Sequence, residues 1–364
     1  MNKEIITEKQ GVSLIILYSV GIPSVIVTAV GAQNDLWISI ILAILIMIPI
    51  GLLYAKLVTI YPNKDIFEVW YLSWGRLLGK FLLLFYIWYL VNISIYALKD
   101  LSEFFRLTVG PETPMIVPMI AGMLLASYAI KKGIGVLARM ASFFLLPILI
   151  FIVLDNLFLL PSVDFKNMQP VLYNGWGPVF KGVLNTISFP LGETVAFTVI
   201  FYTLKGKKEV KKAYIKGIVI SGIILLISSS ITMLVIGPAV ASTYYFPAYI
   251  ATTRINIGNF LQSIEIILAF MFTIGGFTNF TILFLCSAKS VSSLFNIDDY
   301  KTIVIPLGIF MLNLAVFMSK STREFYRFTA DVWPYYAVPF QIIFPIITLI
   351  LAKIKLRNKQ TQKS

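Results

Sequence analysis

The stretch "SFPLGETVAF", residues 188–197, places a helix breaker and an acid inside a long apolar segment. Proline removes a backbone donor and clashes with the preceding helical turn, while glycine permits unwound backbone. An acid such as Glu193 costs about 2.5–3.5 kcal/mol at the centre of a membrane helix and marks a functional position by default. Unwound backbone is tolerated at membrane depth only where it is buried or lines a cavity. If this segment crosses a membrane, the stretch therefore predicts a discontinuous helix beside a cavity.

The composition of the 364-residue chain is that of a membrane protein. Hydrophobic residues make up 58% of the chain and charged residues only 13%, which is about half the charged share of a soluble protein. Several runs approach the roughly 20 apolar residues that a spanning helix needs. The chain has no histidine, one cysteine, no Walker motif and no nucleophile–base pair. We therefore expect no enzymatic activity, no metal site and no cofactor.

We predict an all-α integral membrane protein, with one polytopic domain over residues 1–364 and ten transmembrane helices. If the N-terminus is inside, 22 of the 30 Lys and Arg residues lie on the inner side. Because basic loops stay in the cytoplasm, we expect both termini there. The segment 61–79 is expected to form a short interfacial helix. The spans are expected at 11–31, 36–60, 80–107, 114–131, 136–160, 179–204, 213–238, 261–287, 302–319 and 334–355.

A second interruption in the first expected helix matches the one in the sixth. The sequence "VGIPS", residues 20–24, stands near the middle of helix 1, and Pro23 and Pro190 are separated by five helices. The two helices run in opposite directions, as an inverted repeat of residues 11–160 and 179–355 requires. Each motif alone could be a simple kink, but paired Gly/Pro interruptions are the best sequence pointer to a transporter-type binding site.

These features together resemble the B subunits of bacterial spore germinant receptors. Those subunits are similar to amino acid/polyamine/organocation permeases with a five-plus-five inverted-repeat fold. The resemblance covers essentially the whole chain and includes the broken first helix, the Pro-Leu-Gly-Glu element, "GAQNDLW", "YPNKDIFE" and the basic loop after helix 6. It implies a nutrient sensor in the spore inner membrane or bacterial cell membrane. It also implies an A subunit and a lipoprotein C subunit as partners, and a pocket between helices 1, 3, 6, 8 and 10.

A small zwitterionic ligand, such as an amino acid, is expected to bind at the two breaks. Freed N–H groups at a half-helix start favour a carboxylate, and freed carbonyls accept from an ammonium. No charged side chain is needed for this arrangement. The residues expected to supply these groups are Val20, Gly21, Pro23, Ser24, Val25, Phe189, Pro190 and Gly192.

Three roles are open for Glu193. Its carboxyl group is the partner of a ligand ammonium, or a proton carrier in a permease-like cycle, or a structural tie to the unwound part of helix 1. The structural role and either functional role are compatible with each other.

Other helices offer further candidates for the pocket. On helix 3, Asn92 and Tyr96 follow Tyr89 at helical spacing, and this face either looks into the pocket or is an ordinary packing stripe. On helix 8, Thr273 stands near two glycines, where small residues favour close helix packing and hydroxyls could serve a sodium site. Near the outer end of helix 3, we expect Lys99, Asp100, Glu103 and Arg106 to be paired and hydrated, or to line an entry path.

The function predicted first is a ligand-sensing receptor subunit built on a permease scaffold. A proton- or sodium-coupled amino acid or amine transporter is the main alternative. A passive ion or water path within a complex is the third.

Overall fold

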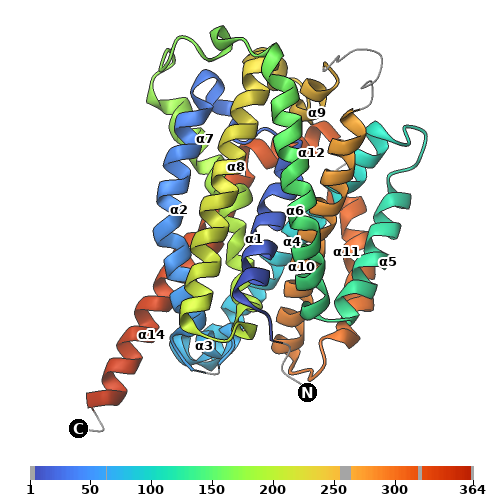
Figure 1. Ribbon diagram of the computed structural model, residues 1–364. Helices are drawn as coiled ribbons and strands as arrows, with labels where there is room; N and C mark the ends of the chain where they lie inside the picture. Colours follow the sequence, from blue (N-terminus) through green and yellow to red (C-terminus); the bar gives the residue numbers. More distant parts are fainter. Residues whose placement is uncertain (1–4, 63, 255–263, 319–321, 362–364) are drawn as a thin grey trace.

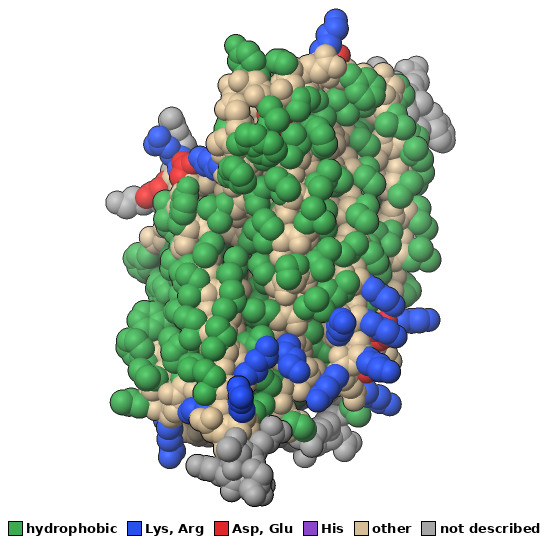
Figure 2. Space-filling view, turned by 90° about the vertical axis from the view of Figure 1, so that its left-hand side faces the viewer, with side chains coloured by type: hydrophobic (Ala, Val, Ile, Leu, Met, Phe, Trp, Pro, Cys, Tyr) green, Lys and Arg blue, Asp and Glu red, His purple; other side chains and the backbone are tan. Residues whose placement is uncertain are grey.

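Long helices run side by side along one axis in the computed structural model (Figure 1), which describes residues 5–62, 64–254, 264–318 and 322–361. Hydrophobic side chains cover the middle of the face shown in Figure 2, and many large ones are exposed, among them Leu77, Phe143 and Phe317. Such a surface suits a lipid environment. The prediction of an all-α integral membrane protein is confirmed.

Seven helical segments in the described ranges are long and apolar enough to cross a membrane, and α5 is a shorter apolar helix. The count of ten spans and the inverted repeat stay predictions. In chain order the helices are α1 (Glu8–Gly21), α2 (Leu36–Thr59), α3 (Ile66–Trp74), α4 (Arg76–Thr108), α5 (Ile116–Lys131), α6 (Ile134–Leu159), α7 (Trp176–Thr186), α8 (Lys207–Ala241), α9 (Pro247–Thr252), α10 (Ile264–Phe295), α11 (Lys301–Met318), α12 (Thr322–Asp331), α13 (Trp333–Val338) and α14 (Phe344–Thr361).

The α-helix stops at both places where the sequence predicts a break. After α1 the chain forms one 3-10 turn, η1 (Ile22–Ser24), and a second 3-10 segment, η2 (Val30–Asp35). After α7 it forms a π-helical turn, η5 (Ile187–Leu191), in which Phe189 is extended, with φ −150° and ψ 123°. The 3-10 helices η6 (Gly192–Val199) and η7 (Phe201–Thr203) follow. Every residue of η6 is buried, so the broken segment lies inside the protein.

The last helix departs from the expected unbroken span over 334–355. A π-helical turn, η9 (Pro339–Ile343), separates α13 from α14. Pro345 has no N–H, so the carbonyl of Gln341, four residues earlier, loses its helical partner. The Tyr54 hydroxyl donates to this carbonyl at 2.6 Å.

The segment 61–79, expected as an interfacial helix, contains the shorter helix α3. Asp65 accepts from the Glu68 backbone N–H at 2.8 Å, and the Glu68 side chain accepts from the Asp65 backbone N–H at 3.2 Å. This capping box fixes the start of α3. Gly75, with φ +83°, ends the helix and turns the chain into α4.

Basic side chains gather at the end of the molecule where α1 begins and α14 ends (Figures 1 and 2). Lys216 and Lys212 of α8 lie 2.7 and 3.3 Å from the carboxylate of Glu8. Hydrogen bonds from Lys216 and Lys212 lower the pKa of Glu8. These ion pairs join the start of α1 to the start of α8.

The end of α1 touches α10 backbone to backbone. A Cβ atom added to Gly275 would lie 2.3 Å from the Gly21 Cα, and one added to Gly21 would lie 2.3 Å from the Gly275 carbonyl carbon. Only glycine at both positions permits this approach, which places the first break directly against α10.

Gly275→Ala is expected to destabilise the protein by about 1–3 kcal/mol, because the added methyl group meets rigid backbone. The neighbouring Gly276→Ala is the matched control, since its Cβ would meet only side-chain atoms, the nearest being the end of Leu101 at 3.3 Å. Thermal unfolding of the two purified variants in detergent measures the difference. Equal melting temperatures would contradict this packing.

Candidate functional site

The backbone groups freed at η5 and η6 are bound by side chains from other helices. Gln341 donates through Nε2 to the Ser188 carbonyl at 2.8 Å and to the Tyr89 hydroxyl at 2.9 Å. Tyr54 contacts the Gly192 carbonyl at 3.4 Å. A buried carbonyl without a partner would be costly in an apolar medium, so Gln341 stabilises the unwound turn.

The break after α1 is satisfied in a similar way. The Ser24 hydroxyl donates to the Gly21 carbonyl at 2.7 Å. Asn279 of α10 donates through Nδ2 to the Tyr18 carbonyl at 3.1 Å. The backbone N–H of Ala248, in α9, donates to the Val25 carbonyl at 3.2 Å. Two other elements, α9 and α10, and the segment's own Ser24 therefore hold this unwound segment.

Glu193 joins the two broken segments. Its Oε2 accepts from the Tyr18 hydroxyl of α1 at 3.1 Å, and the glutamate is only 4% exposed. Phe197, one turn further along η6, meets the Tyr18 ring edge to face at 5.2 Å. The carboxyl group is thus a tie between α1 and η6, and it also faces a cavity.

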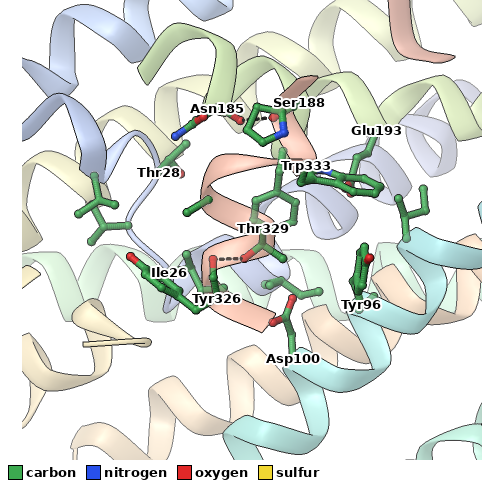
Figure 3. A pocket seen from close by; sticks show the side chains of 18 of the residues that line it. Ile26, Thr28, Tyr96, Asp100, Asn185, Ser188, Glu193, Tyr326, Thr329 and Trp333 are labelled. Carbon is green, nitrogen blue, oxygen red and sulfur yellow. Dashed lines mark hydrogen bonds between the residues drawn. The ribbon is translucent and has the colours of Figure 1, made fainter. Parts of the chain in front are cut away.

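That cavity has a volume of about 130 Å³. It lies between the segment after the first break, the C-terminal half of α4, the turn η5 and the helices α12 and α13 (Figure 3). Its polar lining includes Thr28, Tyr96, Asp100, Asn185, Ser188, Glu193, Tyr245, Asn279, Tyr326, Thr329 and Trp333.

Three of the predicted site residues line this cavity, namely Tyr96, Phe189 and Glu193. Val20, Pro23 and Ser24 line a second, much smaller cavity of about 10 Å³ beside Asp155. The structure therefore places the residues around the first break in two different environments.

The other predicted residues do not line the main cavity. Gly21 packs against α10, and the Gly192 Cα faces Gln341; Val25 and Pro190 are buried. Asn92 donates to the Trp88 carbonyl at 2.7 Å. Thr273 is exposed and donates to the Ala269 carbonyl at 2.8 Å. Whether any of these residues binds a ligand stays a prediction.

The expectation of a hydrated charge cluster at the outer end of α4 is wrong. Lys99, Asp100 and Glu103 are 4%, 8% and 2% exposed. Glu103 does pair with Arg106, at 2.6 Å, whereas Asp100 lines the cavity and accepts from the Tyr245 hydroxyl. These side chains are buried because α12 and the segment before α9 lie over them.

Asp100 and the α12 residues Tyr326 and Thr329 were not among the predicted ligand-binding residues. The sequence of α12, "TREFYRFTAD", is rich in charge and reads as a solvated loop. One signal was present: Phe325 and Phe328 recur at helical spacing, and both rings pack on Tyr96. Only their packing shows that α12 roofs a cavity.

Comparison with known sequences identifies the family. A family model described as "Spore germination protein" matches residues 5–323. The chain is 29% identical to spore germination protein KB of Bacillus subtilis (strain 168) over 367 residues, covering 100% of this chain and 98% of that protein. It is 25% identical to spore germination protein XB of Bacillus anthracis over 253 residues, which is 67% of this chain and 68% of that protein.

Solved structures that match this fold include two transporters. MHP1, a nucleobase-cation-symport-1 family transporter with bromovinylhydantoin bound, matches with a TM-score of 0.67 and 15% identity, over 90% of this chain and 75% of that one. A mutant of the Eremococcus coleocola manganese transporter matches with a TM-score of 0.61 and 12% identity, over 95% and 84% of the two chains. At these identities the likeness shows the fold alone.

Gln341→Leu is expected to destabilise the protein by about 1–3 kcal/mol, because it leaves the buried Ser188 carbonyl unpaired. Tyr89→Phe removes only the second acceptor and is expected to cost about 0.5–1.5 kcal/mol. Thermal unfolding of the purified full chain separates the two. If both variants have the same melting temperature as the unaltered protein, Gln341 does not stabilise the break.

Proposed function

The chain belongs to the spore germination protein family, and on that basis we propose that it is the nutrient-sensing subunit of a germinant receptor. Its ligand is a small amino acid or related compound, bound in the cavity beside the breaks after α1 and α7. The observation that carries this proposal is the buried Glu193 carboxyl group, which faces the cavity and also ties the two broken segments together.

The size of the cavity supports a small ligand. A cavity of about 130 Å³ is close to the engineered cavity of about 150 Å³ that binds benzene. Six or so non-hydrogen atoms therefore fit, which is the size of alanine. A larger ligand would require the roof formed by α12 to move.

Signalling follows from the contacts of Glu193. A ligand shifts an equilibrium only through its different affinity for two states. If its ammonium donates a hydrogen bond to the carboxylate, the tie to Tyr18 changes and α1 is free to move relative to η6. We propose that this change passes to an A-type subunit and a lipoprotein C-type subunit in the spore inner membrane or the bacterial cell membrane.

The proposed orientation has both termini in the cytoplasm. The clustering of Lys residues near the start of α8, at the end where α1 begins and α14 ends, supports it, because positive charge favours the inner side.

A coupled amino acid or amine transporter is the second candidate. The transporter fold favours it, as does a buried carboxyl group that could carry a proton. A catalytic role has no support in the cavity, and we propose none.

Reconstituted in liposomes, the protein is expected not to accumulate labelled amino acids, with or without an imposed proton or sodium gradient. A sensor must bind its ligand and change conformation, but the ligand need not pass through the protein to the other side of the membrane. Filter-binding uptake over minutes measures this. Gradient-dependent accumulation would replace the sensor proposal by the transporter alternative.

Glu193→Gln is expected to raise the nutrient concentration for half-maximal germination by about 10- to 100-fold. A hydrogen bond to a charged group contributes about 1.5–3 kcal/mol, and 1.4 kcal/mol corresponds to tenfold in affinity. The measurement is the germination of spores that depend on this receptor. Glu112→Gln, in an exposed turn, is the control. An unchanged dose response with Glu193→Gln would remove both functional roles of the carboxyl group.

A further inference from the structure

The cavity contains two acidic side chains and no basic one. Asp100 from α4 and Glu193 from η6 both line it, and no Lys or Arg is among its described lining residues (Figure 3). Glu193 is 4% exposed and Asp100 is 8% exposed. Burying charge without a counter-charge is costly, so the lining favours an occupant that carries positive charge.

Among the described basic side chains, Lys99 attracts the Asp100 carboxylate, but it is not part of the cavity lining. Lys99, beside Asp100 in the sequence, donates through Nζ to the Ala315 carbonyl of α11 at 3.1 Å. The same ammonium lies 5.3 Å from the centroid of the Phe325 ring. Arg106 pairs with Glu103 at 2.6 Å. Lys99 and Arg106 thus have partners outside the cavity lining.

The position of Asp100 is fixed by a neighbour. Its Oδ1 accepts a hydrogen bond from the Tyr245 hydroxyl, and Tyr245 stands just before α9. The ring of Tyr245 in turn packs on Tyr326 of α12, with centroids 5.6 Å apart. The carboxylate is therefore held at the cavity wall beneath the α12 roof.

Three neutral polar residues of the lining also have oxygen atoms that can accept hydrogen bonds from a ligand. The Asn279 amide gives its Nδ2 to the Tyr18 carbonyl, which can only accept, so its Oδ1 is left as an acceptor. This Oδ1, the Asn185 Oδ1 and the Thr28 Oγ1 are buried and have no hydrogen-bond partner. Asn279 is 1% exposed. Several N–H groups on one ligand would satisfy them.

We propose that this cavity selects a small dication with two amine groups, with one ammonium at Glu193 and the second at Asp100. The inference rests on the proposed function, because it names the ligand class of the same cavity. The aromatic residues Tyr96, Tyr326 and Trp333 also line the cavity, and aromatic rings attract cations. Asp100 is then the residue that distinguishes a diamine from a monoamine.

The test measures binding to the purified full-length chain by calorimetry, with 1,4-diaminobutane, 1-aminobutane, 1-butanol and alanine as probes. We expect 1,4-diaminobutane to bind at least tenfold more tightly than 1-aminobutane, and 1-butanol to bind most weakly. Asp100→Asn is expected to abolish the difference between the two amines. Asp155→Asn, which changes a partly buried acid outside this cavity, is expected to leave the difference intact.

Each result decides the question. Equal affinity for the two amines in the unaltered protein overturns the proposal, as does a preference for 1,4-diaminobutane that survives Asp100→Asn. If that variant does not fold, the comparison of probes on the unaltered chain decides alone. Tyr245→Phe, which keeps the carboxylate, should then selectively weaken the binding of 1,4-diaminobutane.

Tight binding of alanine without a diamine preference would overturn this inference and leave the nutrient-sensing role standing. Gradient-dependent accumulation of a labelled amino acid in liposomes would instead count against the nutrient-sensing role.

Discussion

Unwound backbone inside an apolar medium must find hydrogen-bond partners, and the rest of this structure is arranged around that constraint. Two segments at the centre of the protein leave the α-helix, and each leaves carbonyl groups without helical donors. Gln341 and Asn279 donate to carbonyls at these breaks from the π-helical turn η9 and from α10, which are distant in sequence. The broken segments therefore depend on the surrounding helices for their stability. Any motion that moves a broken segment away from these helices must replace these hydrogen bonds with others.

The interior of the protein differs on the two sides of Glu193. On the side of Glu193 toward the chain termini, aromatic rings close the interior: Phe197 packs on Phe201 at 4.9 Å, and Phe201 on Tyr214 at 5.1 Å. On the other side a cavity remains, lined by acids and unpartnered acceptors. Glu193 lies at the boundary, so the ligand that we propose for the cavity would act directly on the contact that joins α1 to η6.

Sequence reasoning found the breaks and the acid because proline, glycine and an intramembrane carboxylate have local physical costs that can be read one residue at a time. It predicted Tyr96, Asn92 and Thr273 as site residues. Tyr96 lines the cavity, whereas Asn92 and Thr273 hydrogen-bond to their own helices. The direction of a side chain depends on the rotation of its helix against its neighbours. That rotation is set by contacts such as Gly21 on Gly275, which link residues far apart in sequence.

The sequence by itself determined the class of protein, the two interruptions and the buried acid, because hydropathy and helix-breaking chemistry act locally. It also carried the resemblance that the family comparison confirmed. The tertiary structure alone decided that Glu193 meets Tyr18, that Asp100 joins it at one cavity, and that α12 forms the roof. Those facts depend on packing between elements that are distant in sequence. Whether a charged helix such as α12 covers a cavity or lies in solvent depends on the elements that it packs against.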